Sequence, residues 1–156
     1  MAVDMPARNR PALRAVLLRD PHPAGTTPSL ADVTIVEIFE VPTADEDRAK
    51  QLKDLAETVS ARIRTLNPDI VVIRRADLPP RSSNKEGPRI RLMATGAVAA
   101  AARILVPQTV IRDGKECGAA YGANKQKVDA DASTLVNDRL RDAAAAALAG
   151  LIADRQ

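Results

Sequence analysis

Aromatic residues are almost absent from this chain of 156 residues: tryptophan is missing, and Phe39 and Tyr121 are the only aromatic side chains. A stacking platform for single-stranded nucleic acid needs several aromatic faces, so this class of binding protein is disfavoured. The core has to be built from alanine, valine, leucine and isoleucine, which suits helices packed closely on a parallel sheet. Apolar residues still make up 46% of the chain, which is enough for one ordinary domain with a real core.

Cysteine and histidine are equally scarce, with Cys117 and His22 as the single examples. One cysteine excludes an internal disulfide, and one residue of each type cannot complete a structural zinc site. Long apolar runs are missing as well, because residues 12–18 are too few to span a membrane and include Arg14. The same run lacks the small-residue cleavage pattern of a signal peptide. We therefore expect a cytoplasmic protein that does not act on a membrane.

The net charge is only +3, with a pI of about 9.3, but the positive charges are clustered along the chain. In residues 1–19 four arginines face a single acid, Asp4, and a second basic stretch spans residues 74–91. Clusters that fall in predicted loops suit a polyanion such as nucleic acid, whereas an ordinary solvated surface is the plainer alternative. The second stretch holds Arg74, Arg75, Arg81, Lys85, Arg89 and Arg91.

Alternating strand and helix patterns predict an α/β domain. Residues 1–11 hold two prolines and no periodic pattern, so we interpret them as a basic flexible arm and residues 12–156 as one domain. The unbroken branched run 70–73 is typical of a central parallel strand. The order predicts a mixed sheet flanked by helices. Strands are expected at 12–19, 32–41, 70–73 and 108–112, and helices at 43–66, 89–105, 125–136 and 138–154.

Five short motifs occur in a fixed order between residues 13 and 152. Together they resemble the RuvC-type Holliday junction resolvases of the ribonuclease H-like superfamily. The resemblance implies a ribonuclease H-like fold, action on DNA, a Mg²⁺-dependent nuclease site and a homodimer that handles two strands as a pair. The motifs are Asp20-Pro21, the run 67–73, a helix containing Gly96, the glycine loop that leads to Lys125 and Val128, and Asp142 opening an apolar helix.

The resemblance also implies which residues build the metal site. It expects an acid at the tip of the first strand and another at the start of the last helix, and we assign these metal-binding and catalytic positions to Asp20 and Asp142. Two further acids are expected, but Arg74 and Arg139 stand at those positions. Mg²⁺ prefers several carboxylate oxygens, and an arginine between them repels it. Arg74 could instead pair with one of the two aspartates or bind a phosphate without cutting it.

Two other acids are candidates to restore catalysis. Asp77 lies three residues after Arg74, and Asp138 lies one residue before Arg139. Their plainer interpretations are a loop turn residue and a charge at a helix N-terminus. Which face of the last helix turns inward, and hence whether Asp142 reaches the site, stays open from the sequence.

The leading hypothesis is a nucleic-acid-binding protein for duplex or branched DNA, with a RuvC-like fold and an impaired Mg²⁺ site. The alternatives are an active Mg²⁺-dependent endonuclease or junction resolvase, and a non-enzymatic protein-interaction module. Lys125 and Lys127 follow a glycine loop at a helix start, where lysines and backbone amides suit phosphate, although they could simply be solvated. The candidate nucleic-acid contacts are Arg74, Arg75, Arg81, Lys85, Arg89, Lys125 and Lys127.

Overall fold

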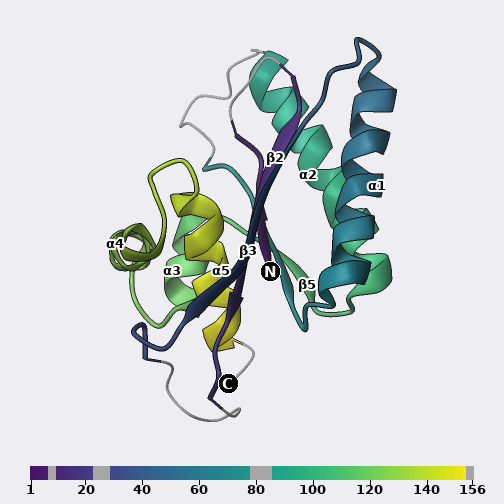
Figure 1. Cartoon of the computed structure of the whole chain (residues 1–156). Helices are drawn as coiled ribbons and strands as arrows, with labels where there is room; N and C mark the ends of the chain where they lie inside the picture. The colour runs from purple at the N-terminus through teal and green to yellow at the C-terminus, as the bar shows by residue number, and fades with distance from the viewer. Residues whose placement is uncertain (7–9, 23–28, 78–85, 154–156) are drawn as a thin grey trace.

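The structure, a computed structural model, describes residues 1–6, 10–22, 29–77 and 86–153. Its centre is a five-stranded sheet that runs through the middle of the molecule (Figure 1). The strands are β1 (Ala2–Asp4), β2 (Ala12–Arg19), β3 (Thr34–Pro42), β4 (Val71–Arg74) and β5 (Thr109–Arg112). Their order is β3-β2-β1-β4-β5, with antiparallel pairing from β3 to β1 and parallel pairing from β1 to β5. The mixed sheet expected from the sequence is confirmed.

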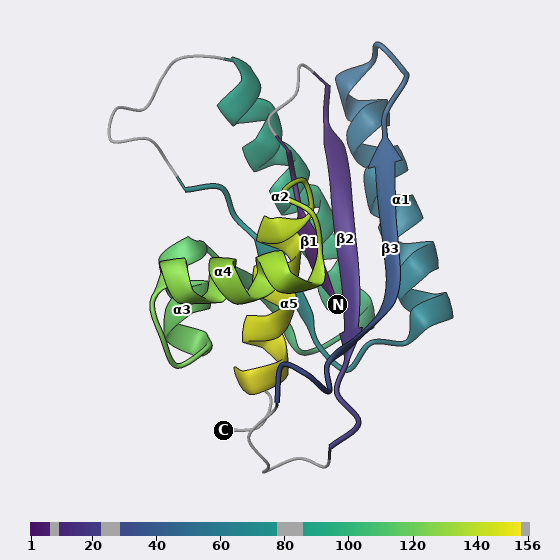
Figure 2. The same cartoon turned by 60° about the vertical axis from the view of Figure 1, so that its left-hand side comes forward.

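Helices cover both faces of this sheet (Figures 1 and 2). On one face lie α1 (Arg48–Leu66) and α2 (Glu86–Leu105), which pack against each other. On the other lies α5 (Arg141–Ala153), which contacts β1, β2 and β4 and is itself covered by α3 (Gly114–Ala120) and α4 (Lys125–Leu135). Each face has its own apolar core cluster. None of the helices, over the residues described, is long and apolar enough to cross a membrane.

Helix α1 shows how local sequence sets the element boundaries. Its N-cap is Asp47, whose carboxylate accepts a hydrogen bond from the Lys50 backbone N–H, so the helix begins later than the capping pattern at Thr43 suggests. Buried apolar residues then recur at helical spacing, as Leu55, Val59 and Ile63 do. The helix ends at Asn67, which adopts the left-handed conformation with a φ of 42°.

The apolar last helix is a core element. Residues 143–150 of α5 are all buried, and their small side chains let the helix approach the sheet closely. At Gly150 an added Cβ would lie 2.9 Å from Val72 Cγ2, so even alanine would press against β4. The alanine-rich sequence therefore holds the start of α5, and with it Asp142, tightly against one face of the sheet.

The first residues of the expected flexible arm belong to the sheet instead. Residues 2–4 form β1, the central strand, which pairs with β2 on one side and β4 on the other. Strand formation here depends on pairing with β2 and with β4, which lies far along the chain, and three residues are too few to show periodicity. Residues 7–9 of the expected arm lie outside the described residues.

A short helix also replaces part of the expected loop 113–124. Asp113 is the N-cap of helix α3 and forms a capping box with Glu116. The residues of this pattern are present in the sequence. The helix places Gly114 beside the carboxyl end of β4.

Candidate functional site

A row of charged side chains crosses the whole sheet at one end. The strand register pairs Glu40 with Arg14, Arg14 with Asp4, Asp4 with Arg74, and Arg74 with Arg112. Side chains alternate between the faces of a strand, and residues two positions away, such as Ala2 and Val72, belong to the α5 core cluster. The row, which we call the charged row, therefore lies on the face that α5 covers.

Helix α5 adds a further acid to the centre of the charged row. Asp142 stands in its first turn and interacts electrostatically with both Asp4 and Arg74. The structure thus brings together one acid from β1, one arginine from β4 and one acid from α5. We call these three residues the Asp4–Arg74–Asp142 cluster.

Asp4 is a carboxylic acid in an unfavourable place for a negative charge. Its residue is only 4% exposed. Burial, followed by the nearby charge of Asp142, raises the pKa of Asp4 from 3.8 to about 6, although Arg91, Arg74 and Arg14 act in the opposite direction. Arg91 reaches this point from α2, where its Nε donates a hydrogen bond to the Met5 carbonyl at 2.8 Å.

Arg74 is buried as deeply, with 3% exposure, yet it is a permanently charged group. Its two terminal nitrogens donate to the two carboxylate oxygens of Asp77, at 3.2 and 3.3 Å. Burial alone would lower the pKa of Arg74, but the hydrogen bond and charge of Asp77, together with the charge of Asp142, raise it above its usual value. The guanidinium is held in place as a cation.

A glycine lies close to this guanidinium. A Cβ added at Gly114 would lie 2.6 Å from an Arg74 terminal nitrogen and 2.5 Å from Lys125 Cε. The Gly114 backbone N–H donates to Asp77 at 2.9 Å, so the same turn also fixes the partner of Arg74. Burial alone would raise the pKa of Asp77, but the hydrogen bonds from Arg74 and Gly114 lower it below the usual value.

Mg²⁺ does not fit this arrangement. Two-metal cleavage of a phosphodiester needs several carboxylates that converge on the ions. Here the centre of the cluster is a guanidinium that already neutralises Asp77 and faces Asp4 and Asp142. No group of three or more potential ligands among histidine, cysteine, aspartate and glutamate is arranged for a metal ion within the described ranges. The site can hold charges in fixed positions and attract anions to its rim.

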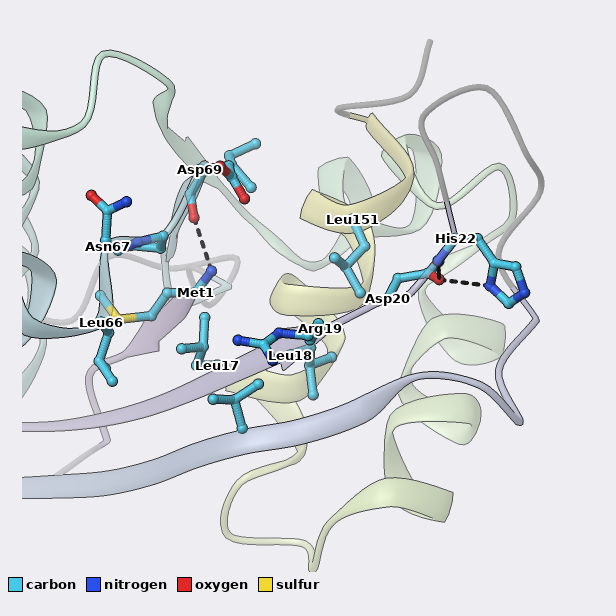
Figure 3. Close-up of a pocket in the computed structure, with 13 residues that line it drawn as sticks. Met1, Leu17, Leu18, Arg19, Asp20, His22, Leu66, Asn67, Asp69 and Leu151 are labelled. Atoms are coloured by element: carbon cyan, nitrogen blue, oxygen red, sulfur yellow. Dashed lines mark hydrogen bonds and ion pairs between the residues drawn. The ribbon is translucent and has the colours of Figure 1, made fainter.

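Asp20 does not join this cluster, so the structure does not bring it together with Asp142. Arg14 lies beside Asp4, and Asp20 lies six residues further along, on the order of 20 Å at about 3.3 Å per residue. Asp20 instead borders a pocket of about 270 Å³ at the other end of the sheet (Figure 3). Its carboxylate lies 2.9 Å from His22 Nδ1. The acid at the tip of the first strand is Asp4.

The two candidate replacement acids have different surroundings. Asp77 does reach the cluster, but as the hydrogen-bonding partner of Arg74 rather than as a substitute for it. Asp138 is exposed in the turn before α5 and lies 3.4 Å from Arg141. Arg139 turns toward the edge of the sheet, where it binds Glu40 at 2.8 and 2.9 Å. Arg74 and Arg139, the two arginines at expected acid positions, therefore each have a carboxylate partner.

The candidate phosphate contacts are partly engaged within the protein. Lys125 binds Asp129 at 2.5 Å and Lys127 binds Asp131 at 2.6 Å, each across one helical turn of α4. Arg75 lies 2.9 Å from Asp113 and remains 39% exposed. Exposed Arg89 lies in the first turns of α2. Arg81 and Lys85 fall outside the residues that the structure describes.

An open cleft adjoins the cluster and gathers charged side chains. It measures about 350 Å³ and lies between the segment after β4 and the starts of α3 and α4. Arg75, Lys115 and Lys125 contribute positive charge, and Asp77 separates the cleft from Arg74. This cleft is the accessible part of the site, because Arg74 itself is buried.

Sequence reasoning did not assign several residues of the site, among them Asp4, Arg14, Glu40, Arg91 and Arg112. A local signal for Asp4 did exist, because the short run Ala2-Val3 ends in an acid just as Val71-Val72-Ile73 ends in Arg74. The positions of Arg14 and Glu40 follow only from the strand register. Arg91 reaches the site by the direction of its side chain, which no sequence pattern reports.

Comparisons with known proteins agree with this architecture. No protein-family model matches the chain, and neither does any curated protein sequence. The structure of Thermus thermophilus RuvC superimposes with a TM-score of 0.69 at 17% identity, covering 98% of this chain and 93% of that one. A second structure, T. thermophilus RuvC in complex with Holliday junction substrate, gives a TM-score of 0.66 at 17% identity, covering 98% and 92%. The chain therefore has the ribonuclease H-like fold of the RuvC Holliday junction resolvases, as its sequence motifs predict.

Proposed function

We propose that this chain binds duplex or branched DNA at the end of the sheet that carries the charged row, and that it leaves the strands uncut. The observation that carries the proposal is the buried Arg74 guanidinium, next to Asp4 in the sheet and within electrostatic reach of Asp142, where metal-dependent cleavage needs carboxylates. The fold supports DNA as the ligand, since one of the structures it matches is RuvC bound to a Holliday junction substrate.

Contacts to the DNA would come from the rim of the site. Arg75 and Lys115 border the open cleft, and exposed Arg89 lies in the first turn of helix α2. Such side chains bind phosphates regardless of base sequence and fix the position of a duplex. With almost no aromatic side chains to stack on bases, binding through phosphates fits better than recognition of single strands.

The first test is an incubation of labelled four-way junction and plain duplex with Mg²⁺, Mn²⁺ or chelator, analysed on native and denaturing gels. We expect a mobility shift that weakens steeply as salt rises, with intact strands under every condition. In the double variant Arg75→Gln/Lys115→Gln the slope of log affinity against log salt should fall by about one for each phosphate that the variant no longer binds. Arg64→Gln, at the opposite end of the sheet, is the matched control.

Each alternative function has its own outcome in this experiment. An active endonuclease is favoured by the gathering of Asp4, Asp77 and Asp142 at one end of the sheet. It would give metal-dependent cutting that disappears in Asp4→Asn and Asp142→Asn. A protein-interaction module would give no shift at any salt concentration. The cytoplasmic location stays a prediction.

We further propose that the chain forms a homodimer through the outer face of α2. Large apolar side chains are exposed there: Leu92 is 64%, Met93 44% and Ile104 82% exposed. Leu92, Gly96, Ala100 and Ile104 are spaced four residues apart and so share a face, and nothing lies within 4 Å of a Cβ added at Gly96. A face of this kind can be covered by the same face of a second copy.

Light scattering coupled to size-exclusion chromatography tests the dimer. We expect the mass of two chains for the wild type and of one chain for Leu92→Asp/Ile104→Asp. The control is Lys53→Asp, an exposed change on α1, which should leave the dimer intact. A monomeric wild type at micromolar concentration would contradict the proposal.

A further inference from the structure

Arg74 has the surroundings of a bound cation. It stands on β4 between Asp4 on β1 and Asp77 in the following segment, and Asp142 of α5 acts on it from above the sheet. A row of buried charges is costly unless each charge has a counter-charge close by. Because the arginine is covalently part of the chain, it places a positive charge beside these acids without any ion from solution.

The chain also makes room for the guanidinium in a specific way. Glycine at position 114 allows a close approach to the terminal nitrogen of Arg74, and the Gly114 N–H donates to Asp77, which accepts both guanidinium hydrogen bonds. A guanidinium is planar and always charged, with donors arranged to match a carboxylate fork. Glycine, aspartate and arginine therefore form one cradle, contributed by three separate segments.

The same carboxylates have the chemistry that divalent cations prefer. Mg²⁺ and Mn²⁺ bind carboxylate oxygens and retain some of their waters. A positively charged guanidinium beside Asp4 and Asp142 repels such an ion. Conversely, a carboxylate at position 74 would put three acids on the α5 face of the sheet, with Asp77 nearby.

We propose that the Arg74 guanidinium is a built-in counter-ion that stands in place of a divalent cation beside Asp4 and Asp142, and that its replacement opens a cation site in this chain. The proposal concerns cations alone, so it holds or fails independently of DNA binding.

Binding of Mn²⁺, followed by the loss of the electron paramagnetic resonance signal of the free ion, tests this directly. The wild type should leave millimolar Mn²⁺ free, whereas Arg74→Glu should bind about one ion per chain. The matched control is Arg75→Glu, which makes the same charge change one residue later at a partly exposed position. Adding Asp142→Asn to Arg74→Glu should weaken binding by tenfold or more. The proposal would be overturned if the wild type bound as much Mn²⁺ as Arg74→Glu, or if Arg75→Glu bound as much as Arg74→Glu. It would also be overturned if none of the proteins bound Mn²⁺.

Thermal unfolding gives a second readout that does not need the glutamate variant to fold. Arg74→Gln removes the cation and leaves the acids, so its melting temperature should fall below that of the wild type. Millimolar Mg²⁺ should then raise it by about 3 °C or more relative to chelator, while leaving the wild type unchanged. Circular dichroism at low temperature shows whether each variant is folded before heating. A wild type stabilised by Mg²⁺ as much as Arg74→Gln would contradict the built-in counter-ion.

Discussion

Replacing Arg74 by methionine is expected to lower the free energy of unfolding by about 3 kcal/mol at pH 8, as measured by urea denaturation. Methionine keeps the length and flexibility of the apolar stem but removes the charge. Asp4 is then left as an ionised, buried carboxylate near Asp142 with one nearby positive charge fewer. Asp77 is half-exposed and can be hydrated, so we place the loss at the lower end of the range for a broken buried ion pair.

Arg75→Met is the control for this change. Arg75 is partly exposed and pairs with Asp113 and Glu116 at the surface, so its loss should cost no more than about 1 kcal/mol. An Arg74→Met variant as stable as the wild type would mean that the guanidinium merely fills space. The Arg74 loss should also shrink at pH 5, where a protonated Asp4 no longer needs a counter-charge.

The fold was predictable because its longest elements carry strong local patterns. The apolar residues of α1 recur at helical spacing, and the branched run that becomes β4 is typical of a buried parallel strand. The order of strands and helices then indicates a mixed sheet with helices on both faces. The central strand β1 was missed because its three residues become a strand only through the partners on either side.

Missing β1 also moved the site to the wrong place. With β2 taken as the first strand, the acid at its end was Asp20, and the true neighbour of Arg74 was assigned to a flexible arm. The sequence did indicate Asp142 and the unexpected arginine at position 74, because each residue lies at the end of an element with a clear local pattern. The partners of Arg74 could not be deduced, since they depend on strand register, on the cradle at Gly114 and on the direction of long side chains.

Replacing Asp4 by asparagine is expected to stabilise the protein by about 3 kcal/mol at pH 8 and to leave its stability nearly unchanged at pH 4. The pKa of Asp4 in the folded chain is raised from 3.8 to about 6. Between these values the folded chain keeps a proton that the unfolded chain has lost, so rising pH destabilises the fold through this group. The favourable contribution of the neutral carboxyl is complete below pH 3.8 and is lost as the pH rises through about 6. Asparagine resembles the neutral acid in shape and never ionises, so it escapes this loss.

The measurement is a series of urea denaturation curves for both proteins from pH 4 to pH 8. The informative quantity is the difference between the two proteins at each pH, because Asp77 and Asp131 have lowered pKa values and titrate in the opposite direction in both. The difference should grow from near zero to its full size around pH 6. A constant difference would show that the Asp4 carboxyl does not titrate near pH 6. A variant less stable than the wild type at pH 8 would show that ionised Asp4 is favourable, because its attraction to Arg74, Arg14 and Arg91 then outweighs burial and the charge of Asp142. If the protein tolerates the loss of Asp4 but not of Arg74, the site is organised around its arginine. A metal-binding site has the reverse organisation, because it depends on its acids.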